Sequence, residues 1–224
     1  MTQEPVTADL RAPVFFLSYA HQHYRLPEPA KDVNQRALQL YVDLSEHVYE
    51  LLGLPPGRDA GFMDRELDGG QKWSAELAYA VGSCQVFIPL LSPQYLISEW
   101  CAREWDAFTR RPFRAHPGAT PSPGETSVIP VIWSYVDPRR LPPEIQQVQV
   151  FSPARLPSSQ MAALYREEGL YGLLNLGREG REAYDVVVWR LAQRVAAAFG
   201  THHVEPRDAQ DFVNLRGRFG EGER

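Results

Sequence analysis

A glutamate and a tryptophan four residues apart, Glu104 and Trp100, have the types and the spacing best suited to chemistry in this sequence. They fall in a segment that predicts a helix over residues 93–109, where positions four apart share one face. An indole beside a carboxylate reduces its hydration, which raises the pKa of the carboxyl group and suits it to proton transfer or to stabilising a cation. By itself, the pattern is more typical of a solvated glutamate and a core tryptophan.

The surrounding segments predict the elements that must position this helix. Apolar runs predict buried strands at 14–19, 84–91 and 128–133, and lesser strands are expected at 60–63 and 147–151. Apolar residues at helical spacing predict further helices at 32–52, 73–81 and 181–199. This alternation predicts an α/β fold, a flavodoxin-like three-layer sandwich with a central parallel sheet of about five strands and helices on both faces. Such sheets bind ligands beyond the carboxyl ends of their strands.

The composition narrows the class of protein. A net charge of −5 over 224 residues argues against nucleic acid as a partner. The longest apolar stretch, Val86–Leu91, is too short to span a membrane, and Met1–Pro13 lacks the pattern of a signal peptide. Cys84 and Cys101 have no metal-ligand spacing, so we expect no bound metal, no disulfide framework and a cytoplasmic location.

Arginines gather directly after the candidate helix, at Arg110, Arg111 and Arg114. Such a run is usually a solvated face. If the following loop folds back, the same cluster could meet a pyrophosphate group.

Pro-rich and polar stretches mark the boundaries of one domain and of the extensions at its two ends. The polar tail at the C-terminal end is expected either to be loose or to become ordered on contact. The expected organisation is an N-terminal extension at 1–12, a domain at 13–200 with elaborations at 20–35, 110–126 and 152–180, and a polar C-terminal tail at 201–224. The elaboration at 110–126 is rich in Pro, Gly and Arg, which predicts a surface loop.

Four motifs in order resemble those of one family. Phe15–Tyr19 is a strand ending in a Ser-Tyr pair, and Gly61–Asp64 is a second strand followed by a loop with the glycines Gly69-Gly70. Ser83–Ser92 is similar to the family's third strand with its terminal serine, and Ser98–Glu104 matches a Ser-x-Trp-Cys-x-x-Glu signature. Together they resemble the TIR (Toll/interleukin-1 receptor) domain family, here as a bacterial stand-alone protein.

The resemblance implies an enzyme that cleaves the nicotinamide–ribose bond of NAD⁺ with Glu104 as its catalytic residue. NAD⁺ is then the substrate, and no cofactor or metal is implied. Self-association is implied through the loop that holds Asp68, Gly69 and Gly70, and a separately encoded sensor or effector is a further expected partner. The implied setting is bacterial antiviral or stress signalling.

The resemblance also implies a set of substrate-binding residues around Glu104. Tyr19 or His21 would cover the nicotinamide or the ribose, and Trp73 would pack at the adenine end. A half-buried strand-end aromatic explains Tyr19 equally well, and for Trp73 a core position is the more typical one. The full expected set is Ser18, Tyr19, Ala20, His21, Trp73, Ser92 and Trp100.

Two other functions remain open at this point. One is a non-catalytic TIR scaffold that assembles through the loop around residues 64–72. The other is an enzyme similar to nucleoside deoxyribosyltransferases, which use a similar sheet and glutamate, although the Ser98–Cys101 box favours TIR. The product (linear ADP-ribose, a cyclic isomer or a transfer product) and the choice between NAD⁺ and NADP⁺ also stay open.

Overall fold

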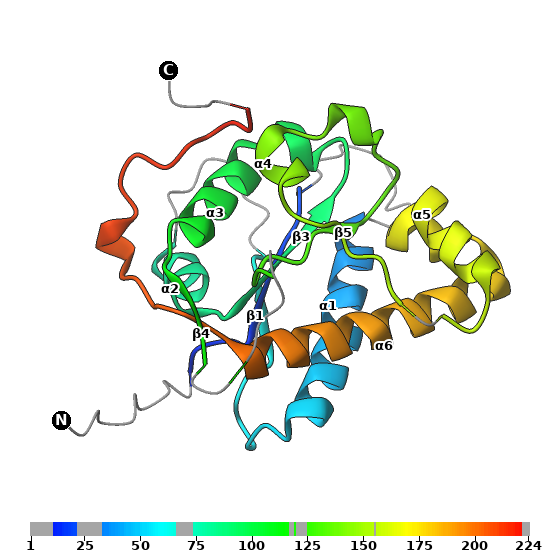
Figure 1. The fold of residues 1–224 in the computed structure, drawn as a ribbon, viewed down its shortest axis with the longest axis horizontal. Coiled ribbons are helices and arrows are strands. Elements are labelled where there is room, and N and C mark those ends of the chain that lie inside the picture. Colours follow the sequence, from blue (N-terminus) through cyan, green and yellow to red (C-terminus); the bar gives the residue numbers. More distant parts are fainter. Residues whose placement is uncertain are drawn as a thin grey trace.

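The computed structural model places four parallel strands between two layers of helices (Figure 1). It describes residues 11–21, 33–65, 74–116, 119, 125–154 and 156–220. The four strands of the sheet are β1 (Phe15–Ser18), β2 (Gly61–Met63), β3 (Val86–Leu91) and β5 (Val131–Ile132). Their order is β2-β1-β3-β5, with β1 at the centre beside β2 and β3. The prediction of a flavodoxin-like α/β fold with a parallel sheet is confirmed.

Side chains of successive strand residues point to opposite faces, and β1 shows this directly. Phe15 and Leu17 pack in one core, with the helices α1 (Val33–Leu52), α5 (Ser159–Leu173) and α6 (Gly177–Thr201). Phe16 packs in the other core, with α2 (Ala75–Ser83) and α3 (Glu99–Thr109). Both faces of the sheet are therefore covered, as the sequence predicts. The remaining short helices are η1 (Tyr95–Ile97), η2 (Pro138–Arg140), α4 (Pro143–Gln146) and η3 (Ala209–Asp211).

The fifth strand predicted at 147–151 is absent from the described part of the sheet. This segment has one backbone hydrogen bond to the edge of the sheet, from Phe151 N to Pro130 O at 2.7 Å. Pro130 has no N–H to donate in return, so a regular ladder cannot form there. The prediction of a strand at 147–151 is wrong for this reason.

Pro89 in β3 explains, together with Pro130, why the edge strand β5 is short. The pairs Phe87↔Val128 and Leu90↔Val131 share one register, which places Pro89 opposite Pro130. Neither residue can donate a backbone hydrogen bond, so the ladder between β3 and its neighbour is interrupted at this pair.

The elaborations carry structure of their own. In the segment predicted as a loop at 110–126, β4 (Phe113–Ala115) pairs antiparallel with β6 (His202–Val204). The loop prediction is wrong there because the partner strand lies nearly ninety residues away in sequence, as the pair Arg114↔His203 shows. In the elaboration at 152–180, α5 contacts the sheet edge through a hydrogen bond from Tyr171 N to Trp133 O of 2.8 Å.

The chain after β6 runs over α2 and α3 as an irregular segment, residues 205–220, which we call the C-terminal segment (Figure 1). Arg207 N donates to Gly82 O at the end of α2, at 2.9 Å. Phe212, Leu215 and Phe219 pack against the core on that side of the sheet. Of the two states expected for the tail, the described residues therefore adopt the one ordered by contact.

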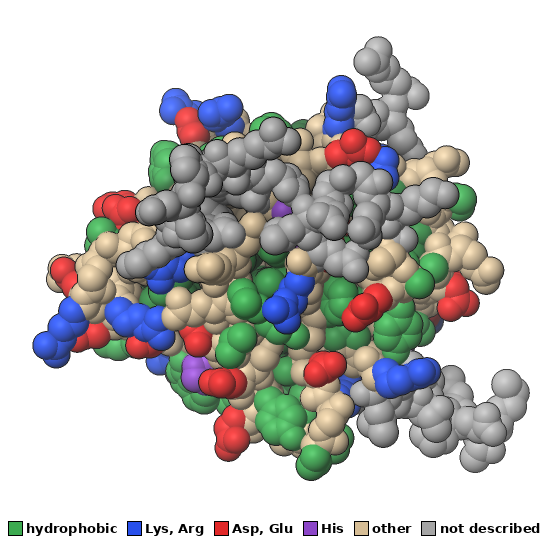
Figure 2. All heavy atoms as spheres, turned by 180° about the vertical axis from the view of Figure 1, so that it is seen from behind, with side chains coloured by type: hydrophobic (Ala, Val, Ile, Leu, Met, Phe, Trp, Pro, Cys, Tyr) green, Lys and Arg blue, Asp and Glu red, His purple; other side chains and the backbone are tan. Residues whose placement is uncertain are grey.

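The distribution of charged side chains and the character of the helices bear on the partners of the protein. On the face turned away in Figure 1, acidic and basic side chains are interspersed over the described surface (Figure 2). Among the described helices, none combines the length and the apolar character needed to cross a bilayer.

Candidate functional site

The strand order puts a topological switch point between the carboxyl ends of β1 and β3. From β1 the chain crosses to β2 on one side, and from β3 it crosses to β5 on the other. Ligands of open α/β sheets bind in the crevice outside such a point. Ser18 is the last residue of β1, and Ser92 directly follows β3, so these residues mark the place to look for chemistry.

Ser18 connects this edge of the sheet to α3. Its side chain is buried, and its hydroxyl donates a hydrogen bond to Glu104 Oε2 at 2.5 Å. The Ser18 Oγ atom also lies 3.1 Å from the hydroxyl oxygen of Tyr95. Three polar side chains from three separate elements thus meet at the switch point.

Glu104 is a buried carboxyl group with a strongly shifted pKa. It lies on the inner face of α3 and is only 5% exposed. Burial raises its pKa from 4.5 to about 8, the hydrogen bond from Ser18 opposes this rise, and the charge of Asp64 adds to it. At neutral pH the group is therefore mostly a neutral carboxylic acid. A cation placed beside it would favour the carboxylate.

Tyr95 was not among the residues singled out from the sequence. It begins η1, and its backbone N–H donates to Ser92 Oγ at 3.1 Å, so that Ser92 holds the turn between β3 and this short helix. Burial, together with the nearby Cys101 and Glu104, raises the pKa of the Tyr95 hydroxyl. The signal that could have found it is the serine three residues earlier, which is typical of a helical turn beginning at the strand end.

Cys101 completes the buried group. Its thiol pKa is raised by burial and by the neighbouring Glu104 carboxyl, with opposing hydrogen bonds to Ser98 and Ser18. A raised thiol pKa disfavours the reactive thiolate. We call Ser18, Tyr95, Cys101 and Glu104 the Glu104 cluster.

Asp64 is a second residue that the sequence analysis missed. Its charge raises the pKa of Glu104, so the two carboxyl groups are electrostatically coupled. Asp64 directly follows β2, and its position after a predicted strand was the signal available in the sequence.

Trp100 has surroundings unlike those of Glu104, although the two residues are four positions apart on α3. Its side chain is 38% exposed, and the Arg103 guanidinium lies 5.3 Å from its ring centroid. The predicted helix at 93–109 is also divided, because Ser98 is extended and caps α3 by accepting from Cys101 N at 3.3 Å. The raised pKa of Glu104 follows first from its own burial, with Asp64 adding to the rise and Ser18 opposing it.

The residues predicted after the first strand lie together. The rings of Tyr19 and His21 stack, with centroids 4.5 Å apart. Tyr19 and Ala20 are buried, whereas His21 is half-buried. This aromatic pair follows Ser18 directly in the chain and so lies at the same edge of the sheet.

Four of the predicted residues cannot be placed. Trp73 and the loop residues Asp68, Gly69 and Gly70 lie outside the described residues. The roles expected for them therefore stay predictions.

The basic cluster after α3 is used within the protein. Arg110 pairs with Asp106 at 2.6 Å, and Arg114 pairs with Glu205 at 2.5 Å. The guanidinium of Arg111 is buried and donates to backbone carbonyls, those of Val81, Cys84, Val204 and Glu205. Arg111 is buried, whereas the Arg114 side chain is 69% exposed, so the prediction of a solvated face holds for only part of the cluster. The pyrophosphate contact stays a prediction, and the cluster ties β4 to α2 and to the C-terminal segment.

A cavity of about 670 Å³ lies at another place in the fold. It is lined from α6 by Arg190, Gln193 and Arg194, and from the sheet edge by Ile129 and Phe151. Arg194 is paired there with Glu125, at 2.7 Å. Neither Ser18 nor Glu104 lines this cavity, so it is separate from the Glu104 cluster.

A family model described as TIR domain matches residues 15–164, a span that begins at β1 and includes all four strands of the parallel sheet and Glu104. The match ends within α5, before α6 and the C-terminal segment. No curated protein matches the chain.

Proposed function

The chain belongs to the TIR domain family, and from that premise we propose that it cleaves the nicotinamide–ribose bond of NAD⁺ with Glu104 as the catalytic residue. The observation that carries this proposal is the position of Glu104. Its carboxyl group is held by Ser18 at the switch point of the sheet, where doubly wound folds bind ligands.

The charge of the substrate fits the environment of this carboxyl group. In the reaction, the bond between ribose C1′ and the ring nitrogen breaks, and its electron pair leaves with nicotinamide, which becomes neutral. The ribose then carries oxocarbenium-like charge, which a carboxylate stabilises directly or traps as an ester. Attack of water on C1′ completes hydrolysis and releases a proton, whereas attack by a nitrogen of the adenine ring gives a cyclic product.

Binding of the substrate would also change the protonation of Glu104. With a pKa of about 8, the group is mostly protonated before binding. The positive charge of the nicotinamide ring lowers the pKa of a nearby carboxyl group, which favours loss of its proton to solvent. The carboxylate would therefore form when the cation that it must stabilise is present.

The other predicted residues have supporting roles in this proposal. Tyr19 and His21 form an aromatic wall for the nicotinamide or ribose, and Trp73 packs at the adenine end. Trp100 and Ala20 line the approach to Glu104, and Ser92 acts indirectly by setting the start of η1. NAD⁺ is the substrate, and the proposal requires no further cofactor.

Family membership supports a role in signal transduction linked to immunity. We propose the more specific setting of bacterial antiviral or stress signalling in the cytoplasm, where the free cysteines Cys84 and Cys101 would stay reduced. TIR domains commonly self-associate, and we propose the loop with Asp68, Gly69 and Gly70 as the contact. A separately encoded sensor or effector would then control assembly.

The test is NAD⁺ consumption by the purified protein at high concentration with a crowding agent, with products identified by mass spectrometry. We expect NAD⁺ loss for the wild type and none for Glu104→Gln or Glu104→Ala. The matched control is Glu99→Gln, because Glu99 lies on the same helix with its side chain exposed and paired with Arg103. NAD⁺ loss that persists in Glu104→Gln would rule out the proposed role of this residue.

The second candidate is a non-catalytic TIR scaffold. It is favoured by the burial of Glu104, since a carboxyl group that is 5% exposed and bonded to Ser18 can equally serve packing. For a scaffold we expect no NAD⁺ loss in any variant. We also expect Gly69→Ala with Gly70→Ala to reduce the mass of the assembly, measured by size-exclusion chromatography with light scattering.

A further inference from the structure

A chain of hydroxyl groups leads from Tyr95 to Glu104. The Tyr95 hydroxyl lies 3.1 Å from Ser18 Oγ, and Ser18 Oγ lies 2.5 Å from Glu104 Oε2. Tyr95 and Ser18 are both buried, so water does not compete freely for these hydrogen bonds. Which group donates and which accepts in each hydrogen bond therefore depends on the protons that Tyr95, Ser18 and Glu104 themselves carry.

Counting protons gives the direction of each bond. A serine hydroxyl has one proton, and when Glu104 is ionised Ser18 uses it to donate to the carboxylate. In that state Tyr95 is the donor in its contact with Ser18, because Ser18 has no second proton. In the opposite direction, Ser18 would donate to Tyr95, and the Tyr95 proton would need another acceptor. Among the described residues, Ser18 is the partner that the Tyr95 hydroxyl has.

We propose that Tyr95 is a positioning residue of the Glu104 site, whose hydroxyl holds the Ser18 hydroxyl in the orientation that donates to the Glu104 carboxyl group. This inference rests on the proposed function for what Glu104 does in catalysis. It does not depend on turnover for its test, because the protonation of Glu104 can be measured directly.

Two contacts hold Tyr95 in place for this role. Its backbone N–H is bound by Ser92 Oγ, which sets the start of η1 at the end of β3. On its outer side, the Tyr95 ring packs against Phe219 of the C-terminal segment, with centroids 5.7 Å apart. A residue near the end of the chain thus contributes to the orientation of the hydroxyl chain at the switch point.

The physical effect follows from which form of Glu104 accepts the hydrogen bond. A donor aimed at a carboxyl oxygen stabilises the carboxylate and lowers the pKa of the group. Without the Tyr95 hydroxyl, the Ser18 hydroxyl can rotate away or accept a proton from neutral Glu104. The pKa of Glu104 should then rise further above its usual range.

The experiment is a pH titration of the Glu104 carboxyl carbon by NMR, in full-length protein labelled at the glutamate Cδ with ¹³C. The signal is assigned by its loss in Glu104→Gln. In Tyr95→Phe, which keeps the ring that packs on Phe219, we expect the titration midpoint to rise by about half to one pKa unit. An unchanged midpoint in folded Tyr95→Phe overturns the proposal.

The matched control is Tyr165→Phe. Tyr165 is equally buried but lies in the core on the other face of the sheet, where its hydroxyl accepts a hydrogen bond from Ile132 N at 3.1 Å. We expect this variant to lose stability without moving the Glu104 midpoint. Equal shifts in both variants would mean a general loosening of the core and would also overturn the proposal.

Action through Ser18 is tested by combining substitutions. Once Ser18→Ala has removed the middle hydroxyl, adding Tyr95→Phe should shift the midpoint no further. A full additional shift would contradict the proposal that Tyr95 acts through Ser18. If Tyr95→Phe fails to fold, 3-fluorotyrosine placed at position 95 keeps the ring and makes the hydroxyl a stronger donor, so the midpoint should fall, and an unchanged midpoint overturns the proposal.

Where NAD⁺ cleavage is measurable, the pH profile of kcat/KM should move with the NMR midpoint in Tyr95→Phe. Failure of the proposed function leaves the NMR result intact, because an inactive protein still has a Glu104 midpoint. The two ideas can therefore fail separately.

Discussion

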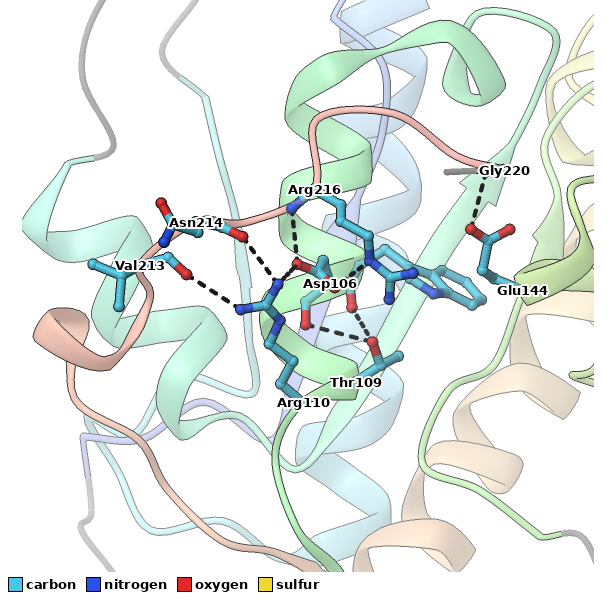
Figure 3. Close-up of polar contacts among 9 residues, drawn as sticks. Asp106, Thr109, Arg110, Glu144, Val213, Asn214, Arg216 and Gly220 are labelled. Atoms are coloured by element: carbon cyan, nitrogen blue, oxygen red, sulfur yellow. Dashed lines mark hydrogen bonds and ion pairs between the residues drawn. The ribbon is translucent and has the colours of Figure 1, made fainter. Parts of the chain in front are cut away.

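Asp106 on α3 accepts two hydrogen bonds from Arg216 of the C-terminal segment, from Nε to Oδ1 at 2.9 Å and from the backbone N–H to Oδ2 at 2.8 Å (Figure 3). Arg110 approaches the same carboxylate and also donates to the backbone carbonyls of Val213 and Asn214. The side chain of Asp106 is 1% exposed, so these partners supply nearly all of its solvation. Two residues away, Glu104 faces Ser18, and α3 is thus held both by the sheet and by the end of the chain.

Arg216→Ala should lower the free energy of unfolding by about 1–3 kcal/mol, because it leaves a buried carboxylate with one cation instead of two. Urea unfolding followed by circular dichroism measures the loss. Limited proteolysis should also cut the C-terminal segment faster. The control is Arg178→Ala on α6, whose ion pair with Glu182 is exposed to solvent and should be worth less than about 0.5 kcal/mol. Equal losses in the two variants would contradict the inference.

The pH dependence of NAD⁺ cleavage should report the unusual pKa of Glu104. If the carboxylate is the active form, kcat/KM rises with pH and levels off above about 8, because burial raises the free-protein pKa to about 8. The measurement is the initial rate at low NAD⁺ concentration from roughly pH 5.5 to pH 9.5, a range that includes the pKa of Glu104. A profile with its rise near the ordinary glutamate pKa would show that a different group titrates.

Stability should depend on pH through the same group, with the opposite sign to a paired carboxylate. The folded pKa is raised, so between about pH 4.5 and pH 8 the unfolded chain has lost a proton that the folded protein keeps. The free energy of unfolding therefore falls as the pH rises through this window, by about 1.4 kcal/mol for each unit of pKa difference. Glu104→Gln should remove this fall and be more stable than the wild type at pH 8. Parallel stability curves for the two proteins would be evidence against a raised pKa.

Two glycines should respond oppositely to alanine. Gly169 has φ +66°, and a Cβ there would lie 2.5 Å from Trp133 O, so Gly169→Ala should cost about 2 kcal/mol or more. Gly200 lies near the end of α6 with open space around it, and Gly200→Ala should stabilise the protein by about 0.5–1 kcal/mol. Thermal unfolding distinguishes the two, and a loss of stability in Gly200→Ala would contradict this interpretation.

Local patterns in the sequence predicted much of the fold. The apolar runs around β1 and β3 and the helical spacing of α1 and α6 reflect burial, which each segment records by itself. The order of the motifs also identified the family and singled out Glu104. The break of the 93–109 helix at Ser98 was less visible, because a serine is compatible both with a helix and with its cap.

The tertiary structure decided which residues far apart in the sequence contact one another. Ser18 and Glu104 are 86 positions apart, Ser18 and Tyr95 are 77 apart, and Arg216 and Asp106 are 110 apart. These contacts depend on β1 lying between β2 and β3, and on the chain returning across α3 after β6. The sequence by itself determined that Glu104 sits on a helix in a TIR-like α/β chain. Only the packing of α3 on the sheet buried its carboxyl group and brought it to a serine hydroxyl, because desolvation and hydrogen bonding act through space and leave no local pattern.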